Sequence, residues 1–379
     1  MASLRRLLAV TSKETREILR DPITVIVAIL LPLVMMFLFT YAITLDVREI
    51  RMAVLDEDGS AESREYVATF LQSRYFRLHA AVRSLREAES LLDKGIVRVV
   101  LVIPSGFSRD LAQGISTQVQ TLLDGSFANT AVLALNYVAA INESYNGRLQ
   151  SEYLAGRYGI DSVDPAIRTA PRVRYNPDLR SEHYIVPGLF AVILMAFPPL
   201  LTALAVVRER ERGSILQIYI SPVRAWEFLG GKLIPSGAIA FLEMLLLLMV
   251  GNLWFQAPVR GSLPLLLALS VLYVFCTVGI GLLISTVTRS QVVAILLSIV
   301  LTLMPAFLFS GFIAAIASMP AFFQWYTYLF PARYFMEISR GISLKGVGLE
   351  RLWPEAVILL VYAATLLALA SLRFHRKIG

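Results

Sequence analysis

Six long apolar runs constrain the fold of this chain more than any other feature of its sequence. They cover residues 23–44, 184–207, 228–250, 263–286, 292–314 and 356–372. A helix needs about 20 such residues to cross a lipid bilayer. Only 17% of the residues are charged, against roughly 25% in soluble proteins. We therefore expect a polytopic α-helical membrane protein with six transmembrane helices.

Lysine and arginine are distributed unevenly beside these runs. Positive residues near the ends of a span stay on the cytoplasmic side. With the N-terminus inside, the inner segments hold most of them, and the short outer segments hold only Arg260, Arg333, Arg340, Lys345 and Arg351. This bias predicts that both termini are cytoplasmic and that residues 46–182 lie outside.

The long outer segment, 46–182, has the pattern of a mixed α/β domain. "RMAVLD", "RVVLVIP" and "TQVQTLLDG" predict strands, and "AESREYVATFLQSR" and "SLREAESLLDKG" predict helices. One long helix is expected over 128–158, followed by an extended, proline-containing return over 164–188. The segment holds 16 basic and 18 acidic residues, so the basic character of the chain is no sign of nucleic-acid binding.

Two further segments border the spans. Residues 1–22 carry leucines and arginines at helical spacing, which predicts an amphipathic helix in the inner interface that ends at Asp21-Pro22. An ordinary positive flank is the alternative. Residues 315–350 are rich in Phe, Tyr and Trp, and we expect short re-entrant helices in the outer leaflet. The expected domains are 1–22, the first span 23–45, the outer domain 46–182, and the remaining spans 183–379.

The chain lacks the motifs of covalent or nucleotide chemistry. A phosphate loop reads G-x-x-x-x-G-K-[ST]. Around Gly231-Lys232, this chain has Trp226 at the position of the first glycine and Leu233 at the position of the serine or threonine. The three histidines show no metal-ligand spacing. We expect no catalytic residue, cofactor site or metal site in this chain, and no enzyme activity of its own.

An acidic residue lies within the third span. Glu243 could bind protons or a cationic substrate group, or it could face an inner cavity or pair with Arg333 or Arg340. Other residues that could line a translocation path through the spans are Met35, Met36, Phe39, Pro305 and Phe309. The alternative for Met35, Met36 and Phe39 is that they face lipid.

A strip of alternating charges, "RERERGS" at 208–214, separates the second and third spans. The following "SILQIYI" can form a short amphipathic helix, so the segment could be a handle through which a partner moves both spans. A loop that only sets topology would explain the arginines but not Glu209 and Glu211. We interpret the charges as salt-bridging anchors at the membrane edge.

The strip and the following "SPVRAWEFLGGKLIP" resemble the signature of ABC type-2 transporter permeases, in the drug and multidrug exporter subfamily with a large external domain after the first span. "KETREILRDP", "NPDLRSEHYIVPG", "VGIGLLISTVTRSQ" and "MPAFLFSGFIAAIASMPAFFQWYTYLFPARYF" occur in the family's order along nearly the whole chain.

This resemblance implies the permease subunit of an exporter in the bacterial inner membrane. ATP and Mg would be bound by separate cytoplasmic ATPase subunits, and a second permease chain would complete a homodimer or heterodimer. A periplasmic adaptor protein could meet the external domain. The substrate expected from the nearly uncharged spans is amphiphilic or drug-like.

The resemblance also assigns candidate site residues. The elbow helix would carry Lys13, Glu14, Arg16, Asp21 and Pro22. A coupling helix over about 208–223 would meet the ATPase through Arg208, Glu209, Glu211, Arg212, Gly213, Ser214, Ile215, Leu216, Ile218, Tyr219, Ser221 and Pro222.

One residue departs from the family pattern. The family often has Glu where this chain has Leu216, which affects the expected ATPase contact and leaves a heterodimer with a sister permease open. Two other functions stay open at this point: an ion-coupled transporter that uses Glu243, and a membrane-anchored sensor whose external domain binds a ligand.

Overall fold

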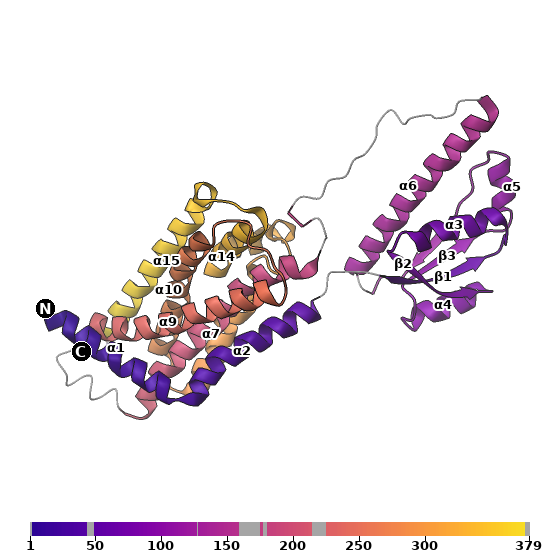
Figure 1. Cartoon of the computed structure of the whole chain (residues 1–379). Coiled ribbons are helices and arrows are strands. Elements are labelled where there is room, and N and C mark those ends of the chain that lie inside the picture. The colour runs from indigo at the N-terminus through magenta and orange to yellow at the C-terminus, as the bar shows by residue number, and fades with distance from the viewer. Residues whose placement is uncertain are drawn as a thin grey trace. The chain divides into compact units, whose positions relative to one another are not determined.

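The computed structural model describes residues 2–43, 49–126, 128–158, 175–176, 180–213 and 225–375. The chain divides into two compact units. One contains Met1–Thr44 and Val173–Gly379, and the other contains Leu45–Arg172. The first unit is helical, and the second is an α/β unit (Figure 1).

Six helical segments among the described residues are long and apolar enough to cross a membrane, as the six apolar runs predicted. They are formed by α2 (Pro22–Ala42), α7 (Ser181–Glu211), α9 (Ala225–Leu253), α10 (Leu263–Val287), the series α11 (Gln291–Ser298), η1 (Ile299–Leu303) and α12 (Met304–Phe309), and α15 (Leu349–His375). The first is preceded by α1 (Ala2–Arg20), which ends before Asp21, where the sequence predicted a helix end.

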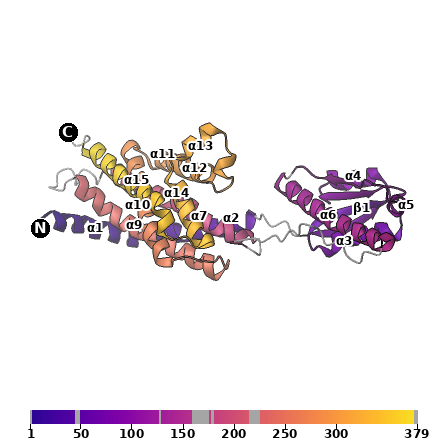
Figure 2. The ribbon, with the colours of Figure 1, turned by 90° about the horizontal axis from the view of Figure 1, so that it is seen from above.

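Helix α7 is the central helix of this unit. Its most apolar stretch is 78% buried, against 22–61% for the other spans, and it packs on α2, α9, α10 and α11. Figure 2 shows the long helices of the unit running alongside one another. α7 begins at Ser181, so the predicted extended return over 164–188 is wrong for its last residues. α7 continues through three internal prolines, Pro187, Pro198 and Pro199, and the Thr202 hydroxyl donates to the Pro198 carbonyl one turn before it at 2.7 Å.

The fifth span is shorter than predicted. It was expected to reach residue 314, but the helix ends at Phe309. Gly311 follows with a φ of +83°, a left-handed conformation that glycine adopts at little cost. A π-helical turn, η1, lies within this span just before Pro305.

Short helices follow the fifth span, where the sequence predicted them over 315–350. They are η2 (Ile316–Ser318), α13 (Ala321–Thr327), α14 (Pro331–Arg340) and η3 (Gly341–Lys345). α14 packs against α7 and α15, and Ser339 donates to the Pro187 carbonyl at 2.7 Å. α14 is therefore tied to the central helix.

The α/β unit is built on a four-stranded sheet in the order β2-β1-β3-β4. β1 (Ile50–Asp56) pairs in parallel with β2 (Phe76–Val82) and β3 (Val99–Ile103), and β4 (Gln120–Leu123) pairs antiparallel with β3. The sequence predicted β1, β3 and β4 but missed β2 and the short α5 (Phe107–Ala112). Strand β2 has exposed residues through its middle, so its hydrophobic alternation is weak.

Helices cover both faces of this sheet. Met52, Val54 and Leu101 face a core shared with α3 (Ala61–Gln72) and α6 (Ala128–Tyr158). The alternate residues Ala53 and Val100 face α4 (Leu85–Asp93). Side chains of a strand alternate between faces, so these nearly continuous apolar strands are buried on both sides (Figure 1).

Candidate functional site

The charged strip forms the last turn of α7 rather than the start of a separate helix. α7 continues through Glu211, and the backbone amides of Arg212 and Gly213 donate to the carbonyls of Arg208 and Arg210, respectively. Gly213 then turns the chain with a φ of +74°. The predicted coupling helix over about 208–223 is thus wrong at its start, and residues 214–224 lie outside the described part of the chain.

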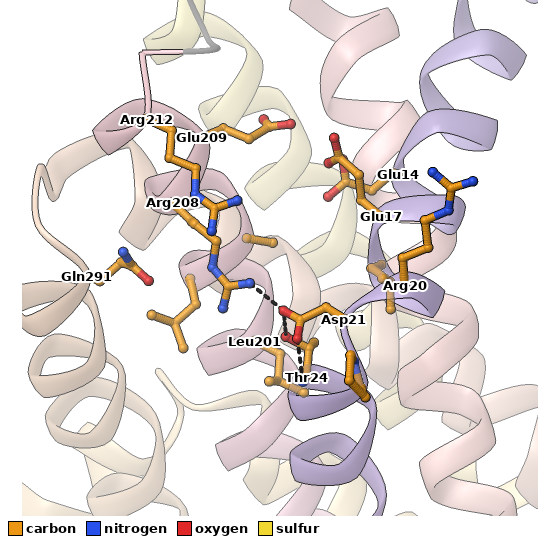
Figure 3. A pocket seen from close by; sticks show the side chains of 14 residues that line it. Glu14, Glu17, Arg20, Asp21, Thr24, Leu201, Arg208, Glu209, Arg212 and Gln291 are labelled. Carbon is orange, nitrogen blue, oxygen red and sulfur yellow. Dashed lines mark hydrogen bonds and ion pairs between the residues drawn. The ribbon is translucent and has the colours of Figure 1, made fainter.

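Arg208 joins α7 to the junction of α1 and α2. Its guanidinium lies 2.5 Å from the Asp21 carboxylate, as Figure 3 shows. Asp21 also caps α2 by accepting from the Thr24 amide at 3.3 Å and the Thr24 hydroxyl at 2.7 Å. The hydrogen bonds from Thr24 and Arg208 lower the pKa of Asp21 to about 2. The residue predicted to end the first helix is therefore also an anchor for the second span.

Glu209 joins α7 to both α1 and α9. It accepts from Lys13 at 2.6 Å and lies 2.9 Å from Lys232. Lys232 also donates to Glu14 at 2.7 Å, and its side chain is only 1% exposed. The buried Lys232 and the half-exposed Lys13 thus balance two buried carboxylates, and such pairing is the condition under which buried charges are tolerated.

Burial and neighbouring charges both shift the pKa values of the two α1 residues in this network, Glu14 and Lys13. Burial raises the pKa of Glu14, and the ammonium of Lys232 opposes that rise. Burial acts to lower the pKa of Lys13, but its hydrogen bond and attraction to Glu209 outweigh this, and the pKa is raised. Lys13 therefore stays charged at neutral pH.

Two glycines let α1 approach α9 closely at this network. A Cβ added to Gly231 would lie 2.5 Å from Cγ1 of Val10, and one added to Gly230 would lie 3.3 Å from Cδ1 of Leu7. Such distances exclude a side chain at Gly231 without movement of α1. The Gly-Gly-Lys sequence therefore supplies both the close packing and the buried ammonium.

The last charges of the strip join α7 to the fourth and fifth spans. Arg210 donates to the carbonyls of Ser285 at 3.0 Å and Thr288 at 2.6 Å, at the end of α10. Glu211 accepts from the backbone amide of Gln291 at 2.8 Å and from its side-chain amide, at the start of α11. Together with Arg208 and Glu209, these contacts link the end of α7 to α1, α2, α9, α10 and α11. We call this set of contacts the charged junction.

A pocket of about 710 Å³ lies at the charged junction, between α1, the start of α2 and α7 (Figure 3). Arg20, Asp21, Arg208 and Arg212 line it together with apolar residues of α7. Glu14, Glu17 and Glu209 bring carboxylate oxygens within 4.8 Å of one another here. Each of the three has a lysine ammonium within 3.3 Å, that of Lys13 or Lys232, so the group has little charge left for a metal ion.

Glu243 lies deep in α9 and is 3% exposed. It lines a cavity of about 30 Å³ between α1, α2, α7 and α9. The predicted pairing with Arg333 or Arg340 is wrong, because Arg333 bonds Gln324 and Thr327 and Arg340 bonds the carbonyls of Gly311 and Phe312. The alternative, that Glu243 faces an inner cavity, agrees with the geometry.

The other predicted path residues do not gather around this cavity. Met36 and Pro305 are buried in the helical core. The ring of Phe39 lies 4.7 Å from that of Phe307, and Phe309 packs on aromatic rings of α13. Met35 also packs against the helical core. None of these five lines the cavity at Glu243.

The remaining predicted site residues fall into two groups. Arg16 is exposed on α1, Pro22 occupies the first turn of α2, and Arg212 and Gly213 end α7. The predicted ATPase-contact residues Ser214, Ile215, Leu216, Ile218, Tyr219, Ser221 and Pro222 lie outside the described residues.

Sequence reasoning missed the importance of Lys232 and Gln291. A lysine within a membrane span needs an acidic partner, and this rule alone would have singled out Lys232. No comparable signal exists for Gln291, because glutamine is common at helix starts and its partner is distant in the sequence.

The sequence matches the family model described as "ABC-2 family transporter protein" over residues 22–372. It is 32% identical over 373 residues to the Escherichia coli (strain K12) "Probable multidrug ABC transporter permease YbhR", which covers 98% of this chain and 99% of that protein. It is 33% identical over 378 residues to "Probable multidrug ABC transporter permease YbhS" of the same strain, covering 99% and 98%. It is 28% identical over 332 residues to "Inner membrane transport permease YhhJ" of that strain, covering 86% of each chain.

Proposed function

Because the chain belongs to the ABC-2 family of transporter proteins, we propose that it is the permease subunit of an ATP-driven exporter of amphiphilic or drug-like molecules. A separate ATPase chain binds and hydrolyses the ATP. The permease works in the bacterial inner membrane, as a dimer with a second permease chain. The named relatives, two multidrug permeases and one inner membrane transport permease, support this proposal.

The charged junction is the observation that carries the mechanism. In our proposal the ATPase engages the segment that follows Gly213, and its closure moves the end of α7. Arg208, Glu209 and Glu211 are bonded to other helices. A movement of the end of α7 therefore also moves the spans to which these residues are bonded. The spans then change between inward and outward access as a unit.

The orientation follows from the same proposal. The charged junction and both termini lie in the cytoplasm, where the ATPase is. The α/β unit lies outside, where an adaptor protein could contact it.

Purification tests whether an ATPase chain binds the permease. The tagged full-length chain, extracted from membranes of cells that naturally contain it, should retain a stoichiometric chain with a phosphate-loop motif that hydrolyses ATP. Recovery of the permease with no ATP-hydrolysing partner would contradict the proposal.

An arginine substitution tests the coupling. Arg208→Gln removes the ion pair with Asp21 and leaves the segment after Gly213 unchanged. We expect the ATPase to remain bound while transport for each ATP hydrolysed falls. The matched control is Arg77→Gln, since Arg77 and its partner Glu49 are 71% and 65% exposed in the α/β unit and exposed pairs contribute little. Equal transport by both variants would contradict the role of the charged junction.

Cysteine labelling tests the orientation. Cys276 is buried, and Cys276→Ser gives a background free of cysteine. In spheroplasts, a membrane-impermeant maleimide should label Lys94→Cys in the α/β unit directly and Glu17→Cys in α1 only after permeabilisation. The reverse result would invert the proposed topology.

A further inference from the structure

Glu243 is a buried carboxylate without a partner among the described residues. Both of its oxygens are inaccessible to solvent, and neither has a hydrogen-bond donor in the described part of the chain. A lone acid within a span is costly, and such residues usually mark a binding or transport site. The fold therefore maintains a carboxyl group with two unsatisfied oxygens in the interior of the helical unit.

The cavity beside Glu243 is small and mostly apolar. Its volume is about 30 Å³, enough for one or two groups of the size of water. Most of the lining is carbon, from residues such as Ala28, Pro198 and Ile239. Thr24, Thr202 and Ser236 also line it. The hydroxyls of Thr24 and Thr202 donate to Asp21 and Pro198, and no hydroxyl of the described residues donates to Glu243. A ligand here would need to bring its own donors and a small positive group.

The cavity adjoins the larger pocket at the charged junction. Ile18, Thr24, Leu201 and Ala205 line both spaces. The larger pocket, of about 710 Å³, reaches the surface, because its lining includes residues of α1 that are exposed, such as Arg20 (Figure 3). The two spaces together offer room for the body of an amphiphile outside and for its head group inside.

We propose that Glu243 binds the primary ammonium group of an amphiphilic substrate, with the rest of that molecule in the adjoining pocket between α1, α2 and α7. This inference rests on the proposed function as an exporter and names the substrate class. A primary ammonium carries three donors and fits a space of about 30 Å³, whereas a trimethylammonium group offers no N–H donor and is several times larger than a water molecule.

Binding of a defined probe tests the inference. The full-length chain in lipid nanodiscs is titrated with radiolabelled n-dodecylammonium, and binding to empty nanodiscs is subtracted. We expect Glu243→Gln to weaken binding at least about tenfold, since a charge-assisted hydrogen bond is lost. Glu350→Gln, an exposed acid on α15, should leave the affinity unchanged. Equal affinity of wild type and Glu243→Gln would overturn the proposal.

Two further comparisons test the shape of the site. Dodecanol and dodecyltrimethylammonium should each bind at least about tenfold more weakly than dodecylammonium, because one lacks the charge and the other the small head group. Ala28→Leu should weaken dodecylammonium binding by filling the cavity while Glu243 is retained. Binding of dodecanol as tight as that of dodecylammonium, or no effect of Ala28→Leu, would assign the probe to lipid or another surface and would overturn the inference.

Failure of this inference can be told from failure of the proposed function. Glu243→Gln should still copurify with the ATPase, because Glu243 is not part of the charged junction. Retention of the ATPase without selective ammonium binding would refute only the cation site. Selective ammonium binding by a chain that retains no ATPase would uphold the cation site and refute the proposed coupling.

Discussion

Replacing Lys232 with methionine should destabilise the helical unit strongly. The Lys232 ammonium lies 2.7 Å from Glu14 and 2.9 Å from Glu209, and the three side chains are 1%, 4% and 9% exposed. Lys232→Met leaves two carboxylates buried with only Lys13 to balance them. Removing one member of a buried ionic group costs about 3–5 kcal/mol. For a chain of this length the apparent unfolding temperature should fall by about 5 °C.

The measurement is thermal unfolding in detergent, followed by tryptophan fluorescence at a fixed scan rate because membrane proteins often unfold irreversibly. Lys345→Met, at an exposed lysine of the same unit, is the matched control and should not change the unfolding temperature. Lys232→Met combined with Glu14→Gln should recover at least half of the loss. In that double variant Glu209 retains Lys13, its partner at 2.6 Å.

The pH dependence of this loss has a definite sign. Burial already raises the pKa of Glu14, and the Lys232 ammonium opposes that rise. Without the lysine, the pKa of Glu14 should rise further, and its protonation at lower pH should relieve the repulsion. The deficit of Lys232→Met should therefore shrink as the pH falls. A deficit that is absent at neutral pH, or a double variant less stable than the single one, would refute the reasoning.

Three further predictions follow from the packing and the charges. Gly231→Ala should destabilise the chain by about 1–3 kcal/mol, because the new Cβ would lie 2.5 Å from Val10, whereas Gly147→Ala in open space should not destabilise it; thermal unfolding compares the two. Because the pKa of Asp21 is lowered to about 2 from 3.8, its ion pair should stabilise the fold above about pH 4 and be lost as the pH falls towards 2. The difference in unfolding temperature between wild type and Asp21→Asn, measured from pH 7 downward, should vanish over that range. Phe70→Ala, at a side chain with no exposure in the α/β unit, should cost about 3–5 kcal/mol. Hydrogen exchange of the strands should accelerate, while exchange in the spans stays unchanged.

Much of the architecture could be predicted from the sequence because the relevant signals are local. A run of 20 apolar residues has few alternatives to a membrane helix, since a bilayer leaves no other way to satisfy the backbone. The long helix over 128–158 and the strand at Val99–Ile103 could be predicted because their periodic patterns also lie in residues adjacent in the chain. The resemblance to ABC type-2 permeases also came from contiguous motifs and agrees with the family match.

The partners within the charged junction could not be predicted in this way. The sequence shows that Arg208 and Glu209 alternate in sign, but not that one meets Asp21 and the other Lys232. Ion pairs between residues far apart in the sequence depend on how α1, α7 and α9 pack. That packing depends in turn on a glycine surface at Gly231 that admits Val10.

The same distinction applies to Glu243. The sequence by itself determined that an acid lies within an apolar span, which follows from order along the chain. Only the tertiary structure decided that Arg333 and Arg340 bond elsewhere and that the cavity beside Glu243 shares lining residues with the pocket at the charged junction. The physical reason is that burial, pairing and cavities arise from the packing of four helices, and side-chain order in any one helix does not specify which faces meet.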